Sequence, residues 1–65
     1  MYTIETLLAT FKINDNVRIT YIDSSRVIYG TVKEYGEDIS LTVDLIPNGL
    51  GWVPVNHPNV LVEKL

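Results

Sequence analysis

The residues best equipped for chemistry lie in one stretch near the end of the 65-residue chain, GWVPVNHP, residues 51–58. It holds the only tryptophan, Trp52, and the only histidine, His57. One histidine without any cysteine cannot supply the three or four ligands of a transition-metal site. As a general base, His57 would need a nucleophile and an orienting carboxylate, and the serines lie in other segments. We therefore expect no enzyme activity, no metal and no cofactor, and a structural corner in which Asn56 and His57 bond to backbone groups.

Three aromatic residues are the candidates for binding: Tyr29, Tyr35 and Trp52. Exposed aromatic side chains offer a large contact area at low entropic cost, which suits a protein interface. Trp52 also has a structural interpretation, because a tryptophan in so small a domain commonly belongs to the core or covers one end of it. We expect Trp52 to cover one end of the domain and to leave part of its ring exposed.

The spacing of apolar residues predicts a short helix within residues 1–12, followed by strands. Thr3 is the expected N-cap of the helix. Its apolar stripe, which must dock on something because two turns do not persist alone, consists of Ile4, Leu7, Leu8 and Phe11. The period then changes to 2, and the predicted strands are Val17–Ile22, Arg26–Tyr35, Ile39–Leu45, Gly51–Val55 and Val60–Leu65.

Five short consecutive strands predict a single mainly-β domain, a small closed or nearly closed SH3-like barrel over residues 15–65. Gly30 fits a bend in the long second strand, where one sheet folds onto itself. The other face of that strand carries Val27, Tyr29 and Tyr35, more apolar surface than a solvated face needs. Either the N-terminal helix covers this face or a protein binds it, and a dimer could combine both. The side chains expected to point inward include Val17, Ile19, Ile28, Val32, Ile39, Leu41, Val43 and Val60.

Three fragments together resemble an uncharacterised family of small proteins from Gram-positive bacteria, the YkvS-like family. They are Gly30-Thr31-Val32, Val43-Asp44-Leu45 and Val55-Asn56-His57. The resemblance covers roughly Asp15 to Lys64 and omits the N-terminal helix. It implies a small cytoplasmic SH3-like barrel, and it implies no particular activity.

A second resemblance links residues 51–57, GWVPVNH, to a segment of eukaryotic signalling SH3 domains. Pro54 and Asn56 match that segment, but His57 stands where those domains have a tyrosine of the peptide groove. The other aromatic residues of that groove are missing from this chain, so this resemblance supports the barrel and not the recognition of proline-rich peptides.

Charge and composition narrow the classes of partner. The net charge is −3, and the five cationic residues are scattered along the chain, which argues against nucleic acid. No apolar run approaches the ~20 residues of a membrane span. A small domain without disulfides suits the cytoplasm. We expect a non-catalytic module of bacterial or phage origin, an adaptor or regulator that binds another protein or a second copy of itself. The alternative is a nucleic-acid-binding barrel of the ribosomal or transcription-elongation type, in which aromatic residues stack on bases.

Overall fold

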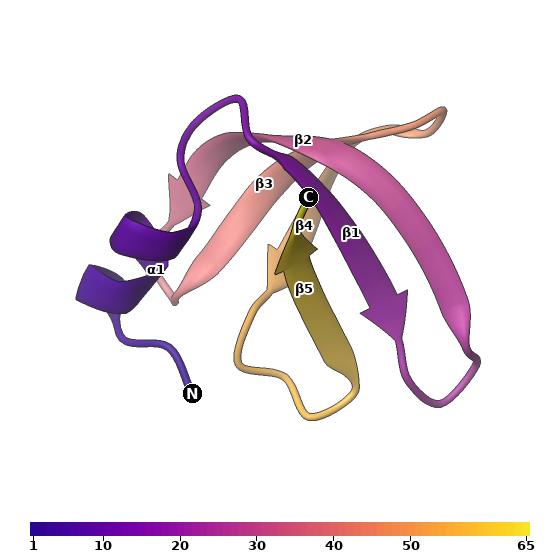
Figure 1. Cartoon of the computed structure of the whole chain (residues 1–65), viewed down its shortest axis with the longest axis horizontal. Helices are drawn as coiled ribbons and strands as arrows, with labels where there is room; N and C mark the ends of the chain where they lie inside the picture. Colours follow the sequence, from indigo (N-terminus) through magenta and orange to yellow (C-terminus); the bar gives the residue numbers. More distant parts are fainter.

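The computed structural model describes all residues, 1–65, and is mainly β. One short helix, α1 (Ile4–Thr10), precedes five strands (Figure 1). The strands are β1 (Asn16–Tyr21), β2 (Arg26–Gly36), β3 (Ser40–Leu45), β4 (Gly49–Pro54) and β5 (Val60–Lys64). Each begins and ends within two residues of its predicted bounds, because each is buried on one face only and shows a period of 2. No helix is long and apolar enough to cross a membrane.

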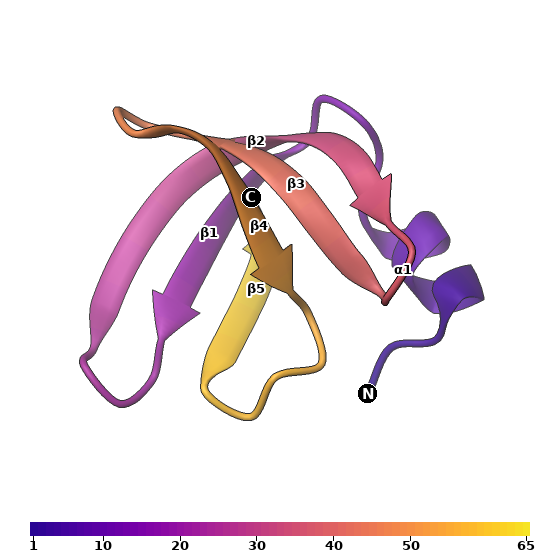
Figure 2. The same cartoon turned by 180° about the vertical axis from the view of Figure 1, so that it is seen from behind.

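The five strands form one antiparallel sheet in the order β4-β3-β2-β1-β5. The sheet is strongly curved, with β2 arching over the molecule so that β1 and β5 face β3 and β4 across the interior (Figures 1 and 2). β4 and β5 are the two outermost strands and do not pair with each other. The sheet therefore stays open along this side and has two free edges.

The hydrophobic core fills the concave side of the sheet. Val17, Ile19, Val32, Leu41 and Val43 are fully buried there, as predicted. The other predicted inward residues are only half-buried: Ile28 is not packed in the core, and Ile39 and Val60 pack at its margin. Ile39 precedes β3 and has a left-handed backbone, with φ 56°. The remaining core side chains are Leu7, Phe11, Val53, Val55 and Val62.

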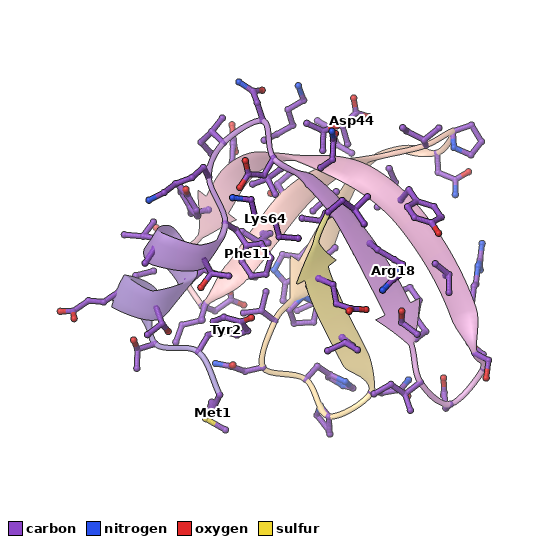
Figure 3. The ribbon with its side chains drawn as sticks, viewed as in Figure 1. Met1, Tyr2, Phe11, Arg18, Asp44 and Lys64 are labelled. Carbon is purple, nitrogen blue, oxygen red and sulfur yellow. The ribbon has the colours of Figure 1, made fainter.

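Helix α1 docks into this core. Thr3 is its N-cap, as predicted: its hydroxyl accepts a hydrogen bond from the Thr6 backbone, and the Thr6 hydroxyl accepts one from the Thr3 backbone. Leu7 and Phe11 are fully buried, and the Phe11 ring packs at 5.6 Å from that of Tyr2 (Figure 3). The helix lies beside the end of β2 and does not cover the outer face of that strand (Figure 1). The alternative that the helix covers that face is wrong, because Leu7 and Phe11 fill the interior instead. The other two residues of the predicted stripe, Ile4 and Leu8, stay exposed.

Gly30 lies in β2 at a point where β2 and β3 approach closely. A Cβ atom at this position would lie 2.5 Å from Val43 Cγ1 and 2.7 Å from the backbone oxygen of Asp44. The two strands therefore leave no room for a side chain at this position.

In the corner between β4 and β5, His57 bonds to nearby backbone, as predicted, whereas Asn56, expected to do the same, bonds to the segment before helix α1. Asn56 Oδ1 accepts a hydrogen bond from the Tyr2 N–H at 2.7 Å, and Asn56 Nδ2 donates one to the Tyr2 carbonyl at 2.8 Å. His57 is exposed, and its Nδ1 accepts a hydrogen bond from the Asn59 N–H. Asn56 therefore ties the segment before helix α1 to a corner 54 residues later in the sequence.

Candidate interaction surface

Tyr35 turns away from the outer face on which the sequence places it. The pairing of β2 with β3 shifts by one residue between Val32 and Glu34, which is a β-bulge. Beyond the bulge, the side chains of β2 exchange faces, so that Tyr35 lies opposite the buried Leu41. Its ring packs against the core, and its hydroxyl donates a hydrogen bond of 2.6 Å to the carbonyl oxygen of Phe11. Tyr35 therefore fastens the end of helix α1 to the sheet.

Tyr29 lies on the outer face as expected, and 49% of its surface is exposed. It belongs to a group of exposed apolar side chains over β1, β2 and β5. Within this group, Val27 and Leu61 flank Thr20 in one row across the three strands. We call this group the Tyr29 patch, and it consists of Ile22, Val27, Tyr29 and Leu61.

An ion pair borders the Tyr29 patch. Arg18 is the cross-strand neighbour of Tyr29 and donates hydrogen bonds to Glu63 Oε1 from Nη2 at 3.0 Å and from Nε at 3.3 Å. The hydrogen bond and charge of Glu63 raise the pKa of Arg18. Figure 3 shows Arg18 over β1 on the side that faces the viewer. Because Glu63 neutralises it, Arg18 adds little net charge to the apolar patch.

Trp52 lies on the outer face of β4, opposite Thr42 of β3, and 61% of its surface is exposed. It is absent from the core and from the side chains packed against the core. The expectation that Trp52 covers one end of the domain is therefore wrong, because its place in the alternation turns it outward while Val53 turns in. Leu50, two residues earlier on the same face, is 71% exposed.

A carboxylate accompanies Trp52. Asp38 Oδ1 accepts a hydrogen bond of 2.7 Å from the buried Ser40 hydroxyl. This bond lowers the pKa of Asp38, with a smaller contribution from the Trp52 side chain. The surroundings of Trp52 are therefore both apolar and acidic.

Tyr29 and Trp52 do not form one continuous site. Trp52 lies in the row of Thr42 and Glu34, five residues beyond Tyr29 along β2 and two strands away. On a flat sheet this would be about 16 Å along the strands and about 10 Å across them. The outer face thus carries two separate apolar areas, and the three predicted binding residues are not brought together.

Sequence reasoning did not single out several exposed apolar residues, among them Ile46, Leu50 and Leu61. The exposure of Leu61 could have been predicted from the sequence, since it alternates with Val60 and Val62 in a strand with one buried face. Leu50 precedes the predicted start of the fourth strand, so its side was not assigned. No group of three or more potential metal ligands gathers anywhere in the structure, and the surface has no pocket.

Comparison with known protein families, with curated proteins and with solved structures gave no match. The resemblance to the YkvS-like family therefore stays a prediction made from the three fragments quoted above.

Proposed function

We propose that this protein is a non-catalytic interaction module of the bacterial or phage-infected cytoplasm, an adaptor or regulator that binds another protein. The observation that carries the proposal is the Tyr29 patch. Its four large apolar side chains stay exposed, because helix α1 packs into the core and leaves this face uncovered (Figure 1). Exposed apolar groups of this kind are typical of protein contact surfaces.

We also propose that the domain is an SH3-like barrel, related to the YkvS-like family. The strand order, with β1 between β2 and β5, supports this assignment, as does the curvature that brings β1 and β5 opposite β3 and β4 (Figures 1 and 2). Small barrels host unrelated functions, so the fold alone does not identify the partner. The kind of partner is inferred from the chemistry of the exposed surface.

The alternative function, nucleic-acid binding, draws less support from the charges. Two of the five cations are already engaged, Arg18 with Glu63 and Lys64 with Asp15. Release of counterions from a phosphate backbone requires free cationic groups, and a protein of net charge −3 has few. We expect weak or no binding of single-stranded DNA or RNA at physiological salt. Tight binding that is lost on Tyr29→Ala or Trp52→Ala would favour this alternative.

The experiment is capture of partners on the immobilised chain from a bacterial lysate, with identification by mass spectrometry and titration of each purified candidate. Tyr29→Lys puts a charge into the Tyr29 patch. It should weaken binding roughly thirtyfold, corresponding to the loss of about 2 kcal/mol that defines a hot spot. Ile13→Lys is the matched control, because Ile13 is exposed and lies outside the patch.

Two results would contradict the proposal. One is that no protein binds the wild-type chain more tightly than a control surface. The other is that Tyr29→Lys and Ile13→Lys bind equally well. Light scattering on the purified chain tests self-association, which would identify the partner as a second copy.

A further inference from the structure

The outer edge of β4 has unpaired backbone groups. β4 pairs only with β3, and the bond from the Val55 N–H to the Ile39 carbonyl fixes the phase of the ladder. Hydrogen-bonded and non-hydrogen-bonded pairs alternate in an antiparallel ladder. The hydrogen-bonded pairs are therefore Leu41–Val53, Val43–Gly51 and Leu45–Gly49. The N–H and C=O groups of Leu50 and Trp52, which fall between them, point away from β3 to the free edge.

Pro54 fits the same phase. It too falls in a non-hydrogen-bonded pair, so its missing N–H faces the free edge and removes no bond from the β3–β4 ladder. No hydrogen bond outside the sheet uses the backbone groups of Leu50 or Trp52. Leu50 and Trp52 thus present two free N–H groups and two free carbonyls at this edge, spaced two residues apart.

The two residues with free backbone groups also carry the two exposed apolar side chains of β4. Proteins commonly protect a free edge with charged residues, lysine above all, and β4 has none. The other free edge, β5, has charged residues, and its free backbone groups do not coincide with exposed apolar side chains. It carries Glu63 and Lys64, and the Asn59 carbonyl accepts a bond from the Ile22 N–H at its start. The unpaired N–H groups of β5 are therefore those of Val62 and Lys64, because the Val60 N–H donates to the His57 carbonyl.

The charges around β4 select the partner. β3 and β4 contain no cation, and Asp44 lies beside Leu50 in the ladder while Asp38 lies beside Trp52. Neither carboxylate belongs to an ion pair. Figure 3 shows Asp44 at the outer rim of the molecule, near the projecting β3–β4 hairpin. A second copy paired through its own β4 would bring no cation to these acids, because β3 and β4 contain none.

We propose that the β4 edge at Leu50 and Trp52 binds an extended basic and apolar segment of another protein, which adds to the sheet as a sixth strand. The backbone groups of the edge require an extended partner. The exposed Leu50 and Trp52 side chains require apolar residues at alternate positions, and the unpaired acids require lysine or arginine flanking them. This proposal rests on the proposed function and names the partner's chemistry.

The probe for this proposal is the peptide KTVTVTK, in which two valines and two flanking lysines share one face of a strand. Fluorescence anisotropy should record binding that weakens as salt is added. The acidic analogue ETVTVTE should bind at least tenfold more weakly. An analogue in which both valines are N-methylated should not bind, because the valine N–H groups are the donors that pair with Leu50 and Trp52.

Amide hydrogen exchange of the wild-type chain reads the contact directly. Saturation with KTVTVTK should slow the exchange of the Leu50 and Trp52 N–H groups at least tenfold, and should leave those of Val62 and Lys64 unchanged. Trp52→Lys should weaken peptide binding at least tenfold, whereas Ile13→Lys, with the same change in charge, should stay within twofold. Melting curves check that both variants are folded.

The edge proposal is overturned if KTVTVTK does not bind, if the Leu50 and Trp52 amides are not protected, or if Trp52→Lys binds the peptide as well as Ile13→Lys does. It is also overturned if these amides are protected without peptide in a chain that light scattering shows to be a dimer, because a second copy then occupies the edge. If captured proteins depend on Tyr29 and not on Trp52, the edge proposal fails while the proposed function stands. If no lysate protein is captured and KTVTVTK binds at the edge, the proposed function fails while the edge proposal stands.

Discussion

Replacement of Gly30 by alanine tests the close approach of β2 and β3. The new Cβ would meet Val43 Cγ1 at 2.5 Å and the Asp44 backbone oxygen at 2.7 Å, whereas Cβ contacts under 3.0 Å essentially never occur. The carbonyl cannot rotate away, so the strands must separate, and overpacking of this kind costs up to about 3 kcal/mol. Alanine recovers roughly 0.5–1 kcal/mol of backbone entropy. The net loss is about 2 kcal/mol, which lowers the melting temperature by roughly 8–16 °C in a domain of this size.

Gly51→Ala is the matched control for this change. Its Cβ would also meet an atom at short distance, Leu45 Cδ1 at 2.6 Å, but this is the end of a flexible side chain. Rotation of Leu45 relieves the contact, so we expect the melting temperature to change by less than about 4 °C. Thermal denaturation followed by circular dichroism measures both variants.

A double variant separates the two contacts made at Gly30. Val43→Ala removes Cγ1 but leaves the Asp44 carbonyl in place, so adding it to Gly30→Ala should not restore the melting temperature. The reasoning is refuted if Gly30→Ala melts as high as Gly51→Ala, or if the double variant regains wild-type stability. Either result would mean that the backbones are free to move apart at little cost.

Three further changes test individual side-chain contacts. Tyr35→Phe should lower the free energy of unfolding by about 1 kcal/mol, since it deletes one hydrogen bond and keeps the ring. Partner binding should not change, and chemical denaturation and the capture assay measure these two effects. Asn56→Ala deletes two hydrogen bonds to Tyr2 and should cost about 1–3 kcal/mol by the same assay, and an unchanged midpoint would argue against the clamp. Because the Ser40 hydrogen bond holds the folded-state pKa of Asp38 below its ordinary value, its stabilisation is complete above about pH 4 and is lost as pH falls through the lowered pKa. Melting curves of Ser40→Ala and wild type should therefore converge on acidification, and a gap that stays constant from pH 7 to about pH 2 would contradict this linkage.

Alternation of apolar residues was sufficient to predict the elements of this fold, because every strand is buried on one side. It was not sufficient to predict which side chains of a strand are buried once the regular pairing was interrupted. The bulge near Lys33 inserts one residue into β2, and the types of the flanking residues do not reveal it. Every side chain beyond that point therefore changes face, and Tyr35 moved from the predicted interface to the core margin.

The remaining misassignments also arise from tertiary structure. The stripe of helix α1 indicates that one face must be buried, but it does not indicate against which surface, and the interior was the better partner. Ile39 adopts a left-handed backbone that β-branched residues rarely take, so no rule of local preference predicts it. Trp52 was judged by its size, which favours burial, whereas its exposure is set by its place in the alternation of β4.

The pairing of β1 with β5 has a consequence for synthesis on the ribosome. β1 is the first strand to emerge, and its partner on one side is β5, the last of the five. Helix α1 emerges earlier still, but two turns do not persist until the core and the Asn56 clamp exist to receive them. Vectorial folding from the N-terminus therefore cannot complete this domain. The nascent chain holds Leu7 and Phe11 unburied until β5 has cleared the exit tunnel, so the helix made first is among the last elements to become structured.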